Sequence, residues 1–102
     1  MSAFLIADVS PADMQAYRNS GYLEAVPKIA AEYGGVYRAR GGRAEVLEGE
    51  WQPKRLVVIE FPSWDQLQAF YHGEAYAPYR DIRQRLTESH IVALEGTDAT
   101  PK

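Results

Sequence analysis

The sequence contains no cysteine and only two histidines, His72 and His90, among its 102 residues. Without cysteine the chain has no disulfide, no zinc–thiolate site and no thiol nucleophile. The histidines lack a His-x-His or His-Glu-x-x-His spacing, so no metal site is predicted. No Gly-x-Ser-x-Gly elbow is present either, which disfavours acyl-transfer hydrolysis.

Excess basic charge and long apolar runs are also missing. The formal net charge of -3 provides no basic footprint for nucleic acid. The first apolar run, Ala3 to Ala7, stops at Asp8 and has no basic leader, so we expect neither a signal peptide nor a membrane span. The paired glycines lack the context of a nucleotide cradle. We therefore expect a cytoplasmic protein with no cofactor and no nucleic-acid or membrane partner.

What is present is typical of one small folded domain. Hydrophobic residues make up 46% and charged residues 25% of the chain. We expect the domain to cover residues 1–95 and a polar, frayed tail to follow over 96–102. A domain of this size buries little surface, so association between subunits would add useful burial.

The first third of the chain predicts a strand followed by a helix. The apolar run 3–9 is typical of a strand covered on both faces. Asp8 lies at the end of this strand. A role in the strand-to-helix turn is the alternative to a functional role for this residue. Ser10 as N-cap and Pro11 as first residue open a helix toward residue 33, with a kink or break at Pro27. Gly34 closes it in the left-handed conformation.

The remaining sequence predicts two strands, a helical region and a last strand. Residues 36–48 read as one long strand with a bulge or bend at Gly41-Gly42. After a turn, residues 55–61 form a buried strand. Ser63 with Gln66 fits a capping box for a helix to His72. Further elements are a helical stretch over 74–88 and a strand over 89–95.

This order, βαββαβ, is that of an α+β ferredoxin-like sandwich, with helices on one face of a four-stranded antiparallel sheet. The other face of the sheet is then left uncovered. An exposed apolar sheet face is unusual in a monomer, so we expect a homodimer in which a partner sheet covers it. Trp51 is the expected anchor of the dimer interface.

Several motifs carry a resemblance across nearly the whole chain. They are Ile6–Val9, Tyr33-Gly34-Gly35, Arg40-Gly41-Gly42, Glu45–Gly49, Trp51, Pro53, Val57–Ser63, Tyr71 and Tyr76. With these motifs the chain resembles the domain-of-unknown-function 1330 family. The resemblance implies a dimeric α/β barrel, in which two sheets pack across a two-fold axis, and a function that is not assigned.

Aromatic and arginine residues provide the best candidate binding site. Tyr71, Tyr76 and Arg83 lie in one stretch, and Arg38 lies on a strand that a helix-over-sheet cleft brings near them. We expect these residues to bind a small carboxylate or an oxygenated ring through planar walls and a guanidinium fork. The alternative is that the tyrosines fill the core and the arginines form surface pairs such as Asp81 with Arg85.

Glu60 and His90 are the candidate catalytic residues. Beneath the helices, burial would raise the pKa of Glu60 and make it a general base. Alternatively, Glu60 pairs with Arg38 or Arg83. His90 is either a base or a strand-end residue bonded to backbone or water.

Two functions therefore stay open. The first is a small-molecule-binding homodimer with a cleft between helices and sheet. The second is a cofactor-independent isomerase or monooxygenase acting on small oxygenated rings, by analogy of fold. A polar cleft that holds Glu60 or His90 beside Tyr71 and Arg83 would favour the enzyme.

Overall fold

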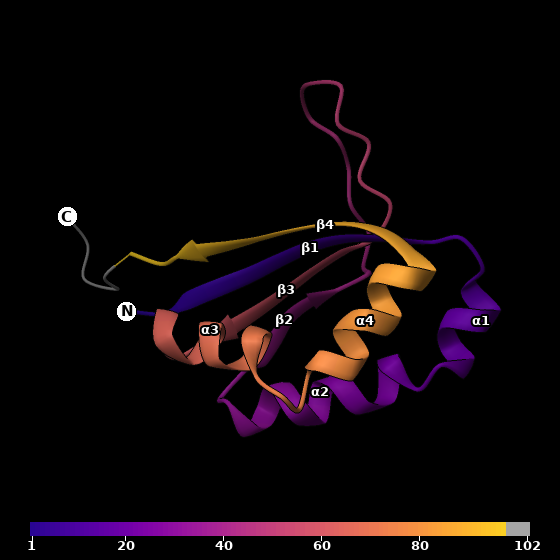
Figure 1. The fold of residues 1–102 in the computed structure, drawn as a ribbon. Coiled ribbons are helices and arrows are strands. Elements are labelled where there is room, and N and C mark those ends of the chain that lie inside the picture. The colour runs from indigo at the N-terminus through magenta and orange to yellow at the C-terminus, as the bar shows by residue number, and fades with distance from the viewer. Residues whose placement is uncertain (98–102) are drawn as a thin grey trace.

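Four strands form one antiparallel sheet in the computed structural model, which describes residues 1–97 (Figure 1). The strands are β1 (Ala3–Pro11), β2 (Val36–Arg40), β3 (Leu56–Phe61) and β4 (Thr87–Glu95), in the spatial order β2-β3-β1-β4. The helices are α1 (Met14–Asn19), α2 (Tyr22–Glu32), α3 (Trp64–His72) and α4 (Ala77–Leu86). All four lie on the same side of the sheet. The predicted ferredoxin-like α+β sandwich is confirmed.

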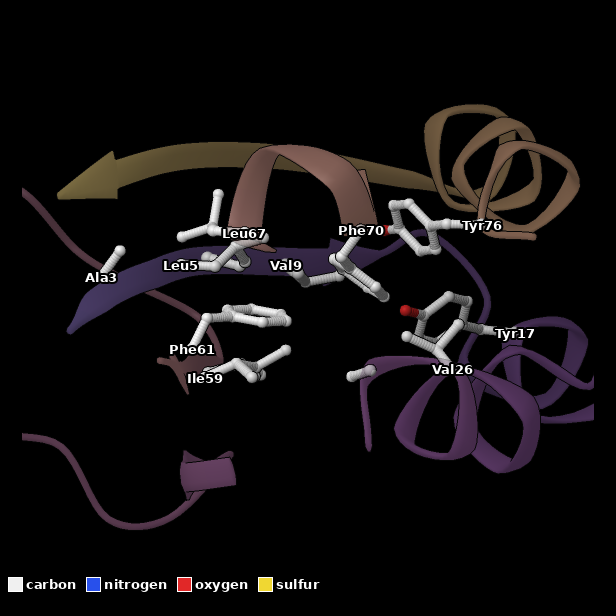
Figure 2. Packing of buried hydrophobic residues seen from close by; sticks show 13 residues of the cluster. Ala3, Leu5, Val9, Tyr17, Val26, Ile59, Phe61, Leu67, Phe70 and Tyr76 are labelled. Carbon is white, nitrogen blue, oxygen red and sulfur yellow. The ribbon is translucent and has the colours of Figure 1, made fainter. Parts of the chain in front are cut away.

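The alternation of side chains along β1 and β3 separates the two faces of the sheet. Leu5, Val9 and Ile59 are buried and point toward the helices, while their neighbours point away. Phe70 of α3 completes the core (Figure 2). Its ring centroid lies 4.7 Å from that of Tyr76 and 5.2 Å from that of Phe61. The core therefore lies entirely between the helices and one face of the sheet, and we call the other face the open face.

The long helix predicted over 11–33 is two helices, and the break is not at Pro27. Pro11 still belongs to β1, and Asp13 caps α1 by accepting from the amides of Gln15 and Ala16. Gly21, with φ of +86°, separates α1 from α2 because it adopts the left-handed conformation at no steric cost.

Pro27 is tolerated inside α2. The proline has no amide hydrogen for the carbonyl of Leu23, four residues earlier. That carbonyl instead accepts a hydrogen bond from Arg40, with an Nη2 to O distance of 2.7 Å. A side chain from β2 thus replaces the missing helical hydrogen bond, so the helix continues through the proline.

The prediction of one long strand over residues 36–48 is wrong. β2 ends at Arg40, and its bulge lies between Tyr37 and Ala39 instead of at Gly41-Gly42. Gly41, with φ of +69°, turns the chain out of the sheet. Residues 41–55, which we call the arm, contain neither helix nor strand and project on the side of the sheet away from the helices (Figure 1).

The C-terminal half follows the prediction closely. The Ser63 hydroxyl accepts from the amide of Gln66, at 3.2 Å, and α3 ends at His72 as expected. The next helix begins at Ala77, later than predicted. None of the helices within residues 1–97 is long and apolar enough to cross a membrane. Most of the predicted tail, residues 98–102, lies outside the described residues.

Gly34→Ala is expected to destabilise the domain. Gly34 has φ of +80°, and a Cβ atom there would lie 2.7 Å from Cγ of Pro62. The left-handed conformation alone costs an L-residue about 1–2 kcal/mol, and the clash adds to that cost. The free energy of unfolding in urea measures the effect. Gly42→Ala is the control, because a Cβ at Gly42 meets nothing within 4 Å. An equal loss in both variants would contradict this account.

Candidate functional site

Three of the four predicted ligand-binding residues come together between α4 and the sheet. Tyr71, Tyr76 and Arg83 are joined by hydrogen bonds, because the Arg83 side chain turns inward from α4. Arg38 is not among them. Its side chain lies on the open face, where it pairs with Glu60. The predicted binding site is therefore smaller than expected and is built from α3, α4 and their connection.

Arg83 is the centre of the site. It is only 3% exposed, the most buried position of α4. Nε donates to the Tyr76 hydroxyl at 3.3 Å, and Nη2 donates to the Tyr71 hydroxyl at 3.2 Å. Nη1 donates to the hydroxyl of Ser89 on β4. Each nitrogen of the guanidinium thus has a hydroxyl oxygen as its partner.

No carboxylate neutralises this buried cation in the described part of the chain. Ion pairs within residues 1–97 join Arg38 to Glu60, Arg85 to Asp81 and His90 to Glu88. Buried charges in proteins are usually paired, because desolvating an ion is costly. Burial indeed works against the charged form of Arg83, but nearby phenol oxygens, Tyr76 first, outweigh burial and raise its pKa. Arg83 is therefore a charged guanidinium without an anion.

Tyr22 and Tyr17 lie beside this cluster as neutral phenols. The hydroxyl oxygens of Tyr22 and Tyr76 lie 2.6 Å apart. Burial, followed by the neighbouring Tyr76, raises the pKa of Tyr22 and brings the pKa of Tyr17 to about 12. Neutral phenols donate as well as accept hydrogen bonds. The cluster thus provides donors and aromatic walls but no negative charge.

Arg83 lies in the wall of two cavities. One is small and enclosed, with a volume of about 40 Å³ between the sheet and the tyrosines. The other opens to solvent and has a volume of about 270 Å³. Tyr71, Arg83, Gln84, Thr87, Ser89 and Ile91 line this second cavity, which we call the α4–β4 pocket. The guanidinium thus separates an apolar interior from a polar, accessible pocket.

The candidate catalytic residue Glu60 lies on the open face, away from Arg83. Its carboxylate accepts from the Ser2 hydroxyl at 2.6 Å and from Nε of Arg38 at 2.9 Å. These two hydrogen bonds, Ser2 first, lower the pKa of Glu60. The burial beneath the helices that would make it a base is absent. The alternative reading, a partner for Arg38, matches the observed contact.

His90, the other catalytic candidate, is also on the open face. It lies opposite Asp8 in the pairing of β1 with β4, and its Nε2 is 3.8 Å from Glu88. Asp8 is part of β1, not of a strand-to-helix turn, and is 8% exposed. Asp8 and His90 line a cavity of about 300 Å³ together with Trp51 and Lys54 of the arm. Neither Glu60 nor His90 therefore reaches the tyrosine–arginine cluster.

Sequence reasoning missed Tyr22 and Ser89 as members of the site. The Tyr22 position was visible as part of the apolar stripe of its helix, but its contact with Tyr76 spans 54 residues of sequence. Ser89 is on the helix-facing side of β4, as its alternation with exposed His90 indicates. A polar residue on a covered sheet face was the available signal for Ser89.

The chain is similar to one known family and to several solved structures. A family model described as "Domain of unknown function (DUF1330)" matches residues 2–97. No protein with a curated description matches. RPA0582, a protein of unknown function from Rhodopseudomonas palustris, is similar in structure, with a TM-score of 0.71, 16% identity, and coverage of 95% of this chain and 83% of RPA0582.

A second similar structure is that of an oxygenase. SnoaB, described as a cofactor-independent oxygenase from Streptomyces nogalater, has a TM-score of 0.53 and 13% identity, and the match covers 99% of this chain and 98% of SnoaB. At these identities the two structures show a shared fold only. The family model, in contrast, spans almost the whole chain. This protein is therefore a member of the DUF1330 family.

Proposed function

We propose that this protein is a homodimer that binds a small carboxylate at Arg83. The observation that carries the proposal is the buried guanidinium whose partners are neutral hydroxyls. An anionic ligand in the α4–β4 pocket would supply the missing negative charge. The cytoplasmic location expected from the sequence stays part of the proposal.

The geometry favours a carboxylate because a guanidinium offers parallel N–H donors that match its two oxygens. Guanidinium groups have five donors, of which Arg83 uses one on each nitrogen within the described protein. The hydroxyls of Tyr71 and Ser89 border the same pocket and are able to donate to an anion. The aromatic rings beside them favour a ligand with a planar apolar body, such as an oxygenated ring acid.

An oxygenase or isomerase is the second candidate, and one observation favours it: SnoaB shares the fold. Such a reaction needs a base beside the ligand to remove a proton. Glu60 and His90 lie on the open face of the sheet, and burial raises the pKa of Tyr22, the tyrosine that contacts Tyr76. Binding is therefore the better supported function.

The homodimer is supported by the apolar character of the open face. Val36, Val92 and Leu94 are 46%, 58% and 55% exposed, on strands whose opposite face carries the core. Isolated exposed aliphatic residues are common, but several on one sheet face, here on both edge strands, form a typical interaction surface. A second copy related by a two-fold axis would cover both faces at once.

Thermal shift and sedimentation test the two parts separately. Benzoate is expected to raise the melting temperature in a concentration-dependent way, because it binds the native state only. Benzamide, the uncharged analogue, is expected to have little effect, and acetate a smaller one than benzoate. Sedimentation equilibrium is expected to give twice the monomer mass. Equal effects of benzoate and benzamide would contradict the anion site, and a monomer at all concentrations would contradict the homodimer.

A further inference from the structure

The arm has exposed apolar side chains that nothing within residues 1–97 buries. Leu47 is 83% exposed, Trp51 60% and Val46 39%. The arm leaves the sheet on the open side, opposite the helices (Figure 1). The same side carries exposed aliphatic side chains on both edge strands, Val36 on β2 and Val92 and Leu94 on β4. One side of the molecule therefore combines a projecting segment that carries exposed apolar side chains with an uncovered sheet face.

Asp8 fixes the base of the arm over this open face. Its Oδ1 accepts from the backbone amides of Lys54, at 2.9 Å, and Arg55, at 3.3 Å. Oδ2 accepts from Nε1 of Trp51, at 3.2 Å. The two limbs also meet at the base, where the amide of Gly41 donates to the carbonyl of Leu56 at 2.8 Å. The direction of the arm is thus set by a buried carboxylate on the sheet.

The reach of the arm decides what it contacts. A limb of about seven residues extends up to about 23 Å. Two sheets packed face to face lie only about 10 Å apart. An arm that projects from the open face therefore passes the level of any sheet docked there. A second copy on this face is consequently within reach of the arm.

The area of the sheet also indicates that the arm takes part in the interface with a second copy. With a rise of about 3.3 Å per residue and about 4.8 Å between strands, the four strands have a flat footprint of about 450 Å². A stable interface buries about 800 Å² on each partner. The sheet alone falls short of that area. The arm, with the exposed side chains of Leu47 and Trp51, is the segment on the same side that is able to supply the difference.

We infer that each arm clasps the second copy of this chain, with Leu47 and Trp51 buried against the partner, and that Asp8 is the positioning residue of the arm. The inference rests on the proposed homodimer and adds the segment that completes its interface. The two-fold axis places each arm on the other protomer, so both copies gain the same contact. The arm is then part of the assembled structure and not a free loop.

Trp51 fluorescence tests the clasp directly. The other tryptophan, Trp64, is 39% exposed on α3 and is removed by Trp64→Phe. In that background, the Trp51 emission is expected to shift to shorter wavelength as the protein concentration rises through the dimerisation range found by sedimentation. A dimer whose Trp51 emission stays that of an exposed indole would overturn the clasp and leave the homodimer intact. Absence of any dimer would overturn both.

Variants separate the arm from the sheet. Leu47→Ser is expected to raise the dissociation constant of the dimer at least about tenfold. Met14→Ser, at an exposed apolar position on α1, is expected to leave this constant unchanged. Asp8→Asn alone is expected to weaken the dimer. Combined with Leu47→Ser, it is expected to add little further weakening, because both substitutions act through the arm. Independent, fully additive effects would remove the positioning role from Asp8, and a silent Leu47→Ser would overturn the clasp.

Discussion

Arg83→Met is expected to abolish carboxylate binding while the domain still folds. Losing one partner of a buried charge-assisted pair costs about 2–5 kcal/mol, so the affinity for benzoate should fall by at least about thirtyfold. The folded protein should tolerate the change, because each hydroxyl around Arg83 has another partner or solvent. Tyr76 keeps its contact with Tyr22, and Ser89 keeps one with Thr87. Titration calorimetry and a melting curve measure the two effects.

Two further arginine variants make the result specific. Arg83→Lys keeps the positive charge but loses the parallel N–H donors of the guanidinium, so this variant should bind benzoate with intermediate affinity. Arg85→Met removes an exposed arginine from the same helix, where it pairs with Asp81 at 3.0 Å. Exposed pairs contribute little, and Arg85 does not line the α4–β4 pocket. If Arg85→Met reduced binding as much as Arg83→Met, the ligand would be held by general positive charge and not by this site.

Phe70→Ala is expected to cause the largest loss of stability in the domain. The Phe70 side chain is 1% exposed and packs between Phe61 and Tyr76 (Figure 2). Removing a fully buried phenylalanine leaves a cavity and costs about 3–5 kcal/mol. Since a domain of this size is stabilised by only about 5–15 kcal/mol in total, the variant should unfold at much lower urea concentration. Chemical denaturation followed by circular dichroism measures the loss.

Trp64→Ala is the matched control for this effect. Trp64 is an aromatic residue on the same helix, but it is 39% exposed at the helix start. Its loss should therefore be well below that of Phe70, because much of its surface is already in contact with water. Similar losses in the two variants would show that the structure overstates the burial of Phe70.

The sequence predicted the order of elements well because local signals decide it. The Ser63 cap and the apolar alternation of β3 act over a few residues, and the structure agrees with both. Pro27 misled the prediction for a physical reason. The residue that compensates it, Arg40, comes from a different element, and a hydrogen bond over 17 residues has no local signature.

The candidate site was predictable in part for the same reason. Tyr71, Tyr76 and Arg83 lie close in sequence and on adjoining helical segments, so their spacing indicated a cluster. Arg38 and Glu60 were assigned without knowledge of which sheet face they occupy. A shift of one residue changes the face, and the bulge in β2 between Tyr37 and Ala39 makes such a shift.

The sequence did not predict the arm, because the composition of residues 41–55 is compatible with a strand as well as with an irregular segment. Val46 favours a strand by propensity, yet within residues 1–97 no strand pairs with it or with Leu47. Asp8, which holds the arm, lies more than 40 residues away in sequence. Its burial on the open face is visible only in the folded chain.

The most direct test of the anion site is an NMR titration that follows the Nε–Hε resonance of Arg83 as benzoate is added. The account predicts a saturable shift of this resonance, with that of Arg85 unchanged, because only Arg83 lines the α4–β4 pocket. The resonance is assigned by its loss in Arg83→Lys. An Arg83 resonance that stays in place at benzoate concentrations that raise the melting temperature would show that the anion binds elsewhere and would contradict the proposed site.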